Sequence, residues 1–131
     1  MSLSQLVESY KFWDVVTLWA RERLEHEDIV ASALARGIIR DGLRFQSIDT
    51  RWAKNEKLDF RGDPYVGFVA KPGQPMVVLR AEALEHLLTI VRTAKKPSRK
   101  KLKDEFVLKE DFKNWLEQTG QPLPSFWFSE K

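Results

Sequence analysis

Apolar residues recur three and four positions apart through the first forty residues of the chain, and this spacing predicts helix. Ser2 and Gln5 have the spacing of a capping box at its start. The polar stretch 26–29 interrupts the pattern, and ordinary helix lengths favour a pair of helices over one bent helix. Gly42 is the glycine expected just beyond the second helix. The first apolar series comprises Leu3, Leu6, Tyr10 and Trp13.

The apolar period changes after Gly42. Residues 43–48 predict a short strand, and the polar, irregular stretch 49–64 ends in a turn signal. Apolar residues predominate in two short stretches, residues 65–71 and 76–80, and the segment between them contains two prolines and a glycine. This arrangement predicts two antiparallel strands joined by a hairpin-like turn.

The remainder of the chain predicts two more helices. Apolar residues share one face over residues 81–94 and again over 110–119, where Gly120 ends the second helix. Residues 106–108 are apolar and extended. Together these elements predict an α+β fold: an N-terminal helix or helix pair, a small antiparallel sheet of two or three strands, and two further helices. We expect residues 1–131 to form a single domain, with a basic linker-like segment at about 92–104 and an extended aromatic tail at about 121–131.

The composition excludes several classes of protein. Of the 131 residues, 43% are hydrophobic and 31% charged, which is typical of a globular domain and not of a disordered or collagen-like chain. The absence of cysteine excludes disulfide frameworks, cysteine-ligated zinc and thiol catalysis. No apolar run approaches the roughly 18 residues of a membrane helix, and the N-terminus does not read as a signal peptide. We therefore expect a cytoplasmic protein with no membrane partner.

The net charge of +3 is concentrated in one segment. Residues 1–91 sum to −1 and residues 104–131 to −3, whereas residues 92–103 sum to +7 and contain no acid. We call residues 92–103 the basic segment. Its cations are Arg92, Lys95, Lys96, Arg99, Lys100, Lys101 and Lys103.

The basic segment predicts an anionic partner or a solvated surface loop. Seven positive charges are too costly to bury, so they must be hydrated or matched by anions. Our leading hypothesis is a bacterial binding or regulatory module whose basic segment contacts nucleic-acid phosphates. The basic segment contains no aromatic residue. We therefore expect it to contact phosphates and not to stack on bases. Continuity with Arg36, Arg40 and Arg44 would strengthen this hypothesis.

The aromatic tail is the second notable feature. The chain has five tryptophans, and it closes on Phe126, Trp127 and Phe128. These rings either fold back and pack on the helix of Trp115 and the core, or they form an exposed anchor for another protein. The second alternative predicts a protein–protein adaptor or a homodimer that uses the N-terminal helix and the tail.

No local motif indicates catalysis. His26 and His86 each lack partners at catalytic or ligand spacing, and Ser98 and Ser125 have no histidine in register. The aspartates of the middle segment are more typical of turns than of a metal site, and so is the tripeptide 61–63. We predict no cofactor, no metal and no catalytic residue, and an enzyme is disfavoured. An enzyme whose site is not marked by local motifs remains an alternative hypothesis, and its polar pocket would be lined by Asp59, Asp63, Arg61 or His86. The third aspartate of the middle segment is Asp49.

One stretch near the C-terminus carries a family resemblance. A short helix with Trp115 is followed by Gly120 and then by Pro124, Ser125, Phe126, Trp127 and Phe128. This pattern of about 20 residues resembles the C-terminal region of short uncharacterised bacterial proteins, often associated with prophages or mobile elements. The resemblance implies a bacterial origin and transfers no catalytic residue. Residues 1–107 resemble no family.

Overall fold

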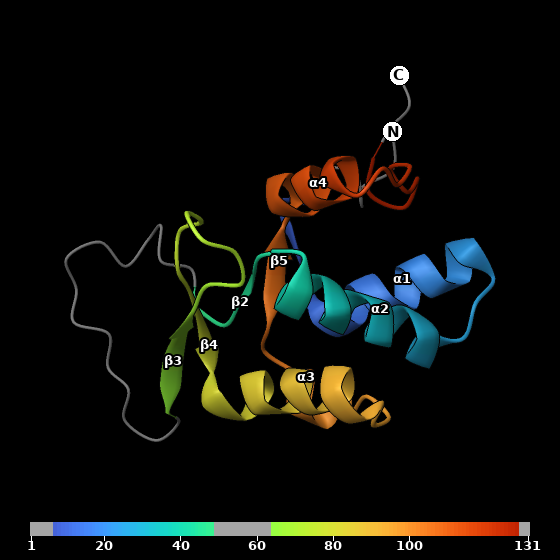
Figure 1. Ribbon diagram of the computed structural model, residues 1–131. Coiled ribbons are helices and arrows are strands. Elements are labelled where there is room, and N and C mark those ends of the chain that lie inside the picture. Colours follow the sequence, from blue (N-terminus) through green and yellow to red (C-terminus); the bar gives the residue numbers. More distant parts are fainter. Residues whose placement is uncertain (1–6, 49–63, 129–131) are drawn as a thin grey trace.

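The computed structural model describes residues 7–48 and 64–128, which form an α+β fold (Figure 1). Its helices are α1 (Phe12–Arg23), α2 (Glu27–Arg40), α3 (Ala81–Thr93) and α4 (Lys109–Gln118). The two helices on either side of residues 24–26 confirm the predicted pair, and α3 and α4 are the two further helices. In Figure 1, α1 and α2 lie between α4 at one end and α3 at the other.

The break between α1 and α2 has a local cause. Leu24 adopts a left-handed conformation (φ 55°) and ends α1. His26 then caps α2, because its Nδ1 accepts a hydrogen bond from the backbone N–H of Asp28 at 3.2 Å. At the other end of α2, the N–H groups of Asp41 and Leu43 both donate to the carbonyl of Gly37, with Gly42 between them at φ 80°. The predicted terminating glycine is thereby confirmed.

Two small antiparallel sheets accompany the helices. Strand β5 (Phe106–Leu108) lies between β1 (Ser9–Lys11) and β2 (Phe45–Gln46), and β3 (Tyr65–Phe68) pairs with β4 (Val77–Arg80). The backbone N–H of Ser47 donates to the carbonyl of Val78 at 2.8 Å and so joins the two sheets. The predicted hairpin and its turn are confirmed, with both strands shorter than expected.

The prediction that helix extends through residues 9–11 is wrong. Ser9–Lys11 forms strand β1, with Tyr10 opposite Val107 of β5. The helical spacing of Tyr10 and Trp13 was misleading because an apolar residue on a short strand and one on the following helix can both face the core. The predicted capping box at Ser2 and Gln5 lies outside the described residues.

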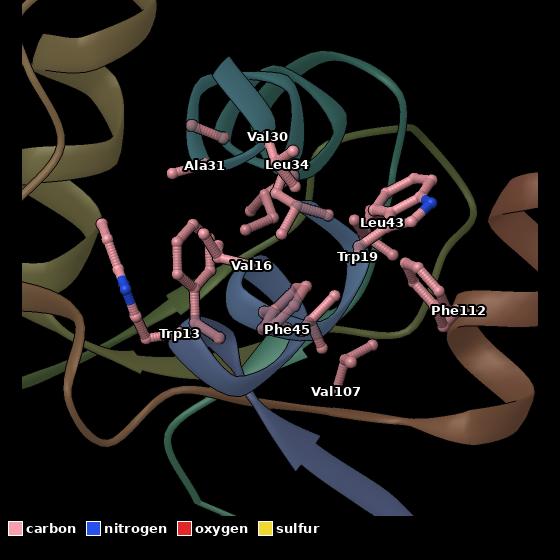
Figure 2. Packing of buried hydrophobic residues seen from close by; sticks show 14 of the residues in the cluster. Trp13, Val16, Trp19, Val30, Ala31, Leu34, Leu43, Phe45, Val107 and Phe112 are labelled. Carbon is pink, nitrogen blue, oxygen red and sulfur yellow. The ribbon is translucent and has the colours of Figure 1, made fainter. Parts of the chain in front are cut away.

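The hydrophobic core is built mainly on α1 and α2. Figure 2 shows Val16 of α1 and Leu34 of α2 in the same interior, with Phe45 and Val107 from the three-stranded sheet beneath them. The buried face of α3 and that of α4 join the same cluster through Leu87 and Phe112. Within the described part of the chain, no helix is long and apolar enough to cross a membrane.

Candidate functional site

The basic segment begins in the last turn of α3 and ends just before β5. Helix α3 ends where Ala94 adopts a left-handed conformation (φ 56°). Pro97 and Leu102 are buried, and Leu102 lies in a short 3-10 helix (Lys100–Leu102). Two apolar side chains thus hold the segment against the protein. The segment is consequently an ordered loop and not a separate linker.

Two buried side chains also bind its backbone. The Nε2 atom of His86 accepts the backbone N–H of Ser98 at 2.9 Å, and the guanidinium of Arg80 donates to the carbonyl of Lys101 at 2.9 Å. Burial lowers the pKa of His86, the positive charges of Lys101 and Lys95 lower it further, and Glu82 opposes them. The neutral ring is the form that can accept a hydrogen bond at Nε2.

The Arg80 side chain is itself held by a buried carboxylate. Glu105 is fully buried, and its two oxygens accept hydrogen bonds from Nε and Nη2 of Arg80, both at 2.9 Å. The hydroxyl of Ser47 donates to Glu105 at 2.6 Å and accepts the backbone N–H of Arg80 at 2.9 Å. The hydrogen bonds that Arg80 donates to Glu105 raise the pKa of Arg80, burial opposes this shift, and the charges of Glu105, Asp104 and Glu82 raise the pKa further. This network ties β4, the residue just before β5, the residue just after β2 and the basic segment together.

The positive charges of the segment face solvent. Six of its cations are exposed, and Lys101 is half-buried. Lys96 lies 3.8 Å from a carboxylate oxygen of Asp28. Among the described residues, no other cation of the segment has a carboxylate within ion-pair distance. The exposed cations are Arg92, Lys95, Lys96, Arg99, Lys100 and Lys103.

A groove runs between the basic segment and α2. It has a volume of about 370 Å³ and is lined by Lys95 and Lys96 from the basic segment and by Asp28, Ser32 and Arg36 from α2. Arg36 therefore extends the positive surface across the groove. Arg44 does not: it is half-buried and lies 3.3 Å from Asp111. Arg40 is exposed in the last turn of α2 and does not line the groove.

The aromatic tail packs on the core. Trp127 and Phe128 are buried, and Phe126 packs against the cluster from its edge. The ring of Trp127 stacks on Phe112 at 5.6 Å between centroids, and its Nε1–H donates to the carbonyl of Val7 at 2.7 Å. The expectation that the tail folds back is confirmed. An anchor for another protein would need these rings to leave the core.

The remaining candidate residues fall into two groups. Within the described chain, His26 is an exposed helix cap and His86 a buried acceptor, and no group of three histidines or acids gathers to hold a metal ion. The hydroxyl of Ser125 lies 2.9 Å from Glu22. The candidates outside the described residues are Asp49, Asp59, Arg61, Gly62 and Asp63.

Sequence reasoning missed the buried pair of Arg80 and Glu105. The only local signal is the acid-rich pair 104–105 directly after a run of bases, and it does not show which cation comes back to meet it. No protein-family model, curated protein or solved structure matches the chain. The resemblance of the C-terminal stretch to bacterial proteins stays a prediction.

Proposed function

We propose that the protein is a binding module whose basic segment contacts the phosphates of a nucleic acid. One observation carries the proposal. The exposed cations stand on a backbone that is fixed to the core at Ser98 and Lys101, and within residues 7–48 and 64–128 the one ion pair they make is between Lys96 and Asp28 at 3.8 Å. A solvated loop that serves solubility alone has no need of buried side chains to hold its shape.

A fixed backbone favours phosphate binding for a physical reason. Cations that are already placed lose less conformational entropy on binding than cations on a flexible tail. Arg36 adds a further cation across the groove, so a phosphate chain can be contacted from two sides. Such contacts carry little sequence information, and we expect binding with weak sequence preference.

Salt dependence is the first test. If four cations each neutralise a phosphate, the log–log slope of affinity against salt is about −3 to −4, or about a hundredfold loss between about 50 and 200 mM salt. Fluorescence anisotropy with labelled generic DNA, single-stranded and duplex, measures this slope. No binding at low salt overturns the proposal.

Matched charge variants make the test specific. The triple variant Lys95→Gln/Lys96→Gln/Lys100→Gln is expected to weaken binding and to make the slope shallower by about 3. The control neutralises three exposed lysines elsewhere, Lys11, Lys71 and Lys113, and gives the same net charge. Equal losses in the two variants would show that net charge alone is responsible and would overturn the assignment to the basic segment.

A further inference from the structure

The first half of the basic segment is held to the protein by very few contacts. Residues 95–98 lie between α3 and the 3-10 helix, in neither helix nor strand. Within the described chain, their backbone N–H groups make a single hydrogen bond, from Ser98 to Nε2 of His86 at 2.9 Å. Pro97 is buried and adds an apolar contact. The two lysines of this stretch, which line the groove, are therefore held in place largely by one imidazole.

The ring of His86 can accept this hydrogen bond in only one protonation state. An imidazole nitrogen accepts while it carries no proton, and both nitrogens of the protonated ring are donors. After protonation, the N–H at Nε2 would face the N–H of Ser98, and neither group would have an acceptor. His86 is only 3% exposed, so water does not readily replace the lost partner. A single proton thus breaks the contact.

The charges nearest to His86 add to this effect. Burial lowers the pKa of His86 most, Lys101 and Lys95 lower it further, and Glu82 on the same helix opposes them. Protonation places a positive charge in the field of two lysines that belong to the basic segment. Movement of the segment away from the ring relieves both the facing donors and the repulsion between like charges.

The other elements that pack against α3 carry charges that are largely paired. On β4, Arg80 donates to the carboxylate of Glu105 at 2.9 Å, and on α2, Asp28 lies 3.8 Å from Lys96. Arg36 of α2 lines the groove together with the lysines. The repulsion that protonation creates therefore acts mainly between the ring and the basic segment.

The segment, and not the helix, is the part that can move. Helix α3 is fixed in the core by residues such as Leu87, whereas residues 95–98 would keep only the packing of Pro97. The second anchor, from the guanidinium of Arg80 to the carbonyl of Lys101, does not titrate between neutral and mildly acid pH. Protonation of the imidazole would consequently free the first half of the segment and leave the second half in place.

We infer that His86 is a pH switch for the basic segment: the neutral ring holds Ser98 and fixes the groove lysines, and the protonated ring releases them. This inference rests on the proposed function, because it makes phosphate binding tighter at neutral than at acid pH. Released lysines must be ordered again on binding, which costs affinity. The positive charge of the ring attracts phosphate and works against this loss, but salt of about 0.1 M screens that attraction over about 10 Å.

Amide hydrogen exchange of the wild-type protein tests the switch without any nucleic acid. Protection factors, corrected for the intrinsic effect of pH on exchange, are measured by NMR between about pH 7.5 and about pH 5.0. We expect that of Ser98 to fall about tenfold, as for one lost hydrogen bond. That of Ala94, whose N–H bonds to Ile90 at the end of α3, is expected to stay constant. The fall should have the same midpoint as the titration of the His86 ring, and a different midpoint or no fall overturns the inference.

Matched variants assign the effect to one ring. In His86→Gln the side-chain oxygen can accept the Ser98 N–H at every pH, so the fall in protection should disappear. His26→Asn removes the other of the two histidines and keeps a capping acceptor, so the wild-type fall should remain. An equal fall in His86→Gln overturns the inference and leaves the proposed function standing.

Binding of labelled generic single-stranded DNA completes the test. At about 0.1 M salt, we expect wild-type affinity to fall about fivefold relative to that of His86→Gln when the pH is lowered over the same range. A ratio of the two affinities that does not change with pH, or that changes in the opposite direction, overturns the inference while binding itself upholds the proposed function. Absence of binding at both pH values overturns the proposed function, and the inference with it.

Discussion

The buried pair of Arg80 and Glu105 offers the sharpest test of how this fold holds its basic segment. Glu105→Leu removes a carboxylate that accepts three hydrogen bonds: two from the Arg80 guanidinium at 2.9 Å and one from Ser47 at 2.6 Å. The guanidinium is left almost fully buried. Removing one member of a buried ion pair costs about 3–5 kcal/mol. Asp104 lies 3.6 Å from Arg80, so it keeps part of the compensation. We expect a loss of about 3 kcal/mol in the free energy of unfolding, at the low end of that range.

The double variant separates the pair from its surroundings. Arg80→Met alone leaves the fully buried Glu105 charged with Ser47 as its remaining hydrogen-bond donor, and we expect a loss of about 4–5 kcal/mol. The double variant Arg80→Met/Glu105→Leu leaves no buried charge without a counter-ion. Its remaining loss in the free energy of unfolding comes from the Lys101 carbonyl and the Ser47 hydroxyl, which each lose a hydrogen-bond partner, and is about 2–3 kcal/mol in total. The coupling energy of the cycle is therefore expected at about 4–6 kcal/mol.

Urea unfolding followed by tryptophan fluorescence measures these free energies by linear extrapolation. The control is Glu117→Leu, the same chemical change at an exposed carboxylate of α4, which is expected to stay within about 0.5 kcal/mol of wild type. A loss below about 1 kcal/mol for Glu105→Leu would refute the reasoning. So would a double variant whose loss equals the sum of the two single losses.

Three further predictions concern other parts of the fold. Trp127→Ala is expected to cost about 3–5 kcal/mol in urea unfolding, because the ring is fully buried against Phe112; an unchanged midpoint would show that the tail is not part of the core. The lowered pKa of His86 means that the unfolded chain binds more protons than the folded one, so the contribution of His86 to stability is fully present above the ordinary histidine pKa of 6.5 and is lost as the pH falls below it. His86→Phe should reduce this loss of stability at acid pH, and an unchanged pH profile of urea midpoints would contradict the assignment. Gly42→Ala should cost more than Gly73→Ala, since both have a positive φ but only at Gly42 would a Cβ meet a side chain, at 2.6 Å; thermal midpoints in the reverse order would refute this.

Local rules were sufficient for most of the elements. The helix of residues 81–93 follows from its apolar face, the hairpin from its prolines and glycine, and the end of α2 from Gly42. Each of these depends on the conformational preference of a few neighbouring residues. Strand β1 was missed because three residues carry too little periodicity to distinguish a strand from the first turn of a helix. Its pairing with β5 joins residues almost one hundred positions apart, which no local pattern reports.

Two properties of the protein can be read from the order of its residues: an α+β fold without cysteine chemistry, and a positive charge gathered in residues 92–103. Both follow from composition and local spacing. The folded arrangement was needed to show that Arg80 and His86 hold that segment in place, that Arg36 extends its surface, and that Trp19 and Trp115 border a cavity beside α2. Burial and hydrogen-bond partnership arise only when distant segments come together, and the free energy that joins those segments is distributed over the whole core.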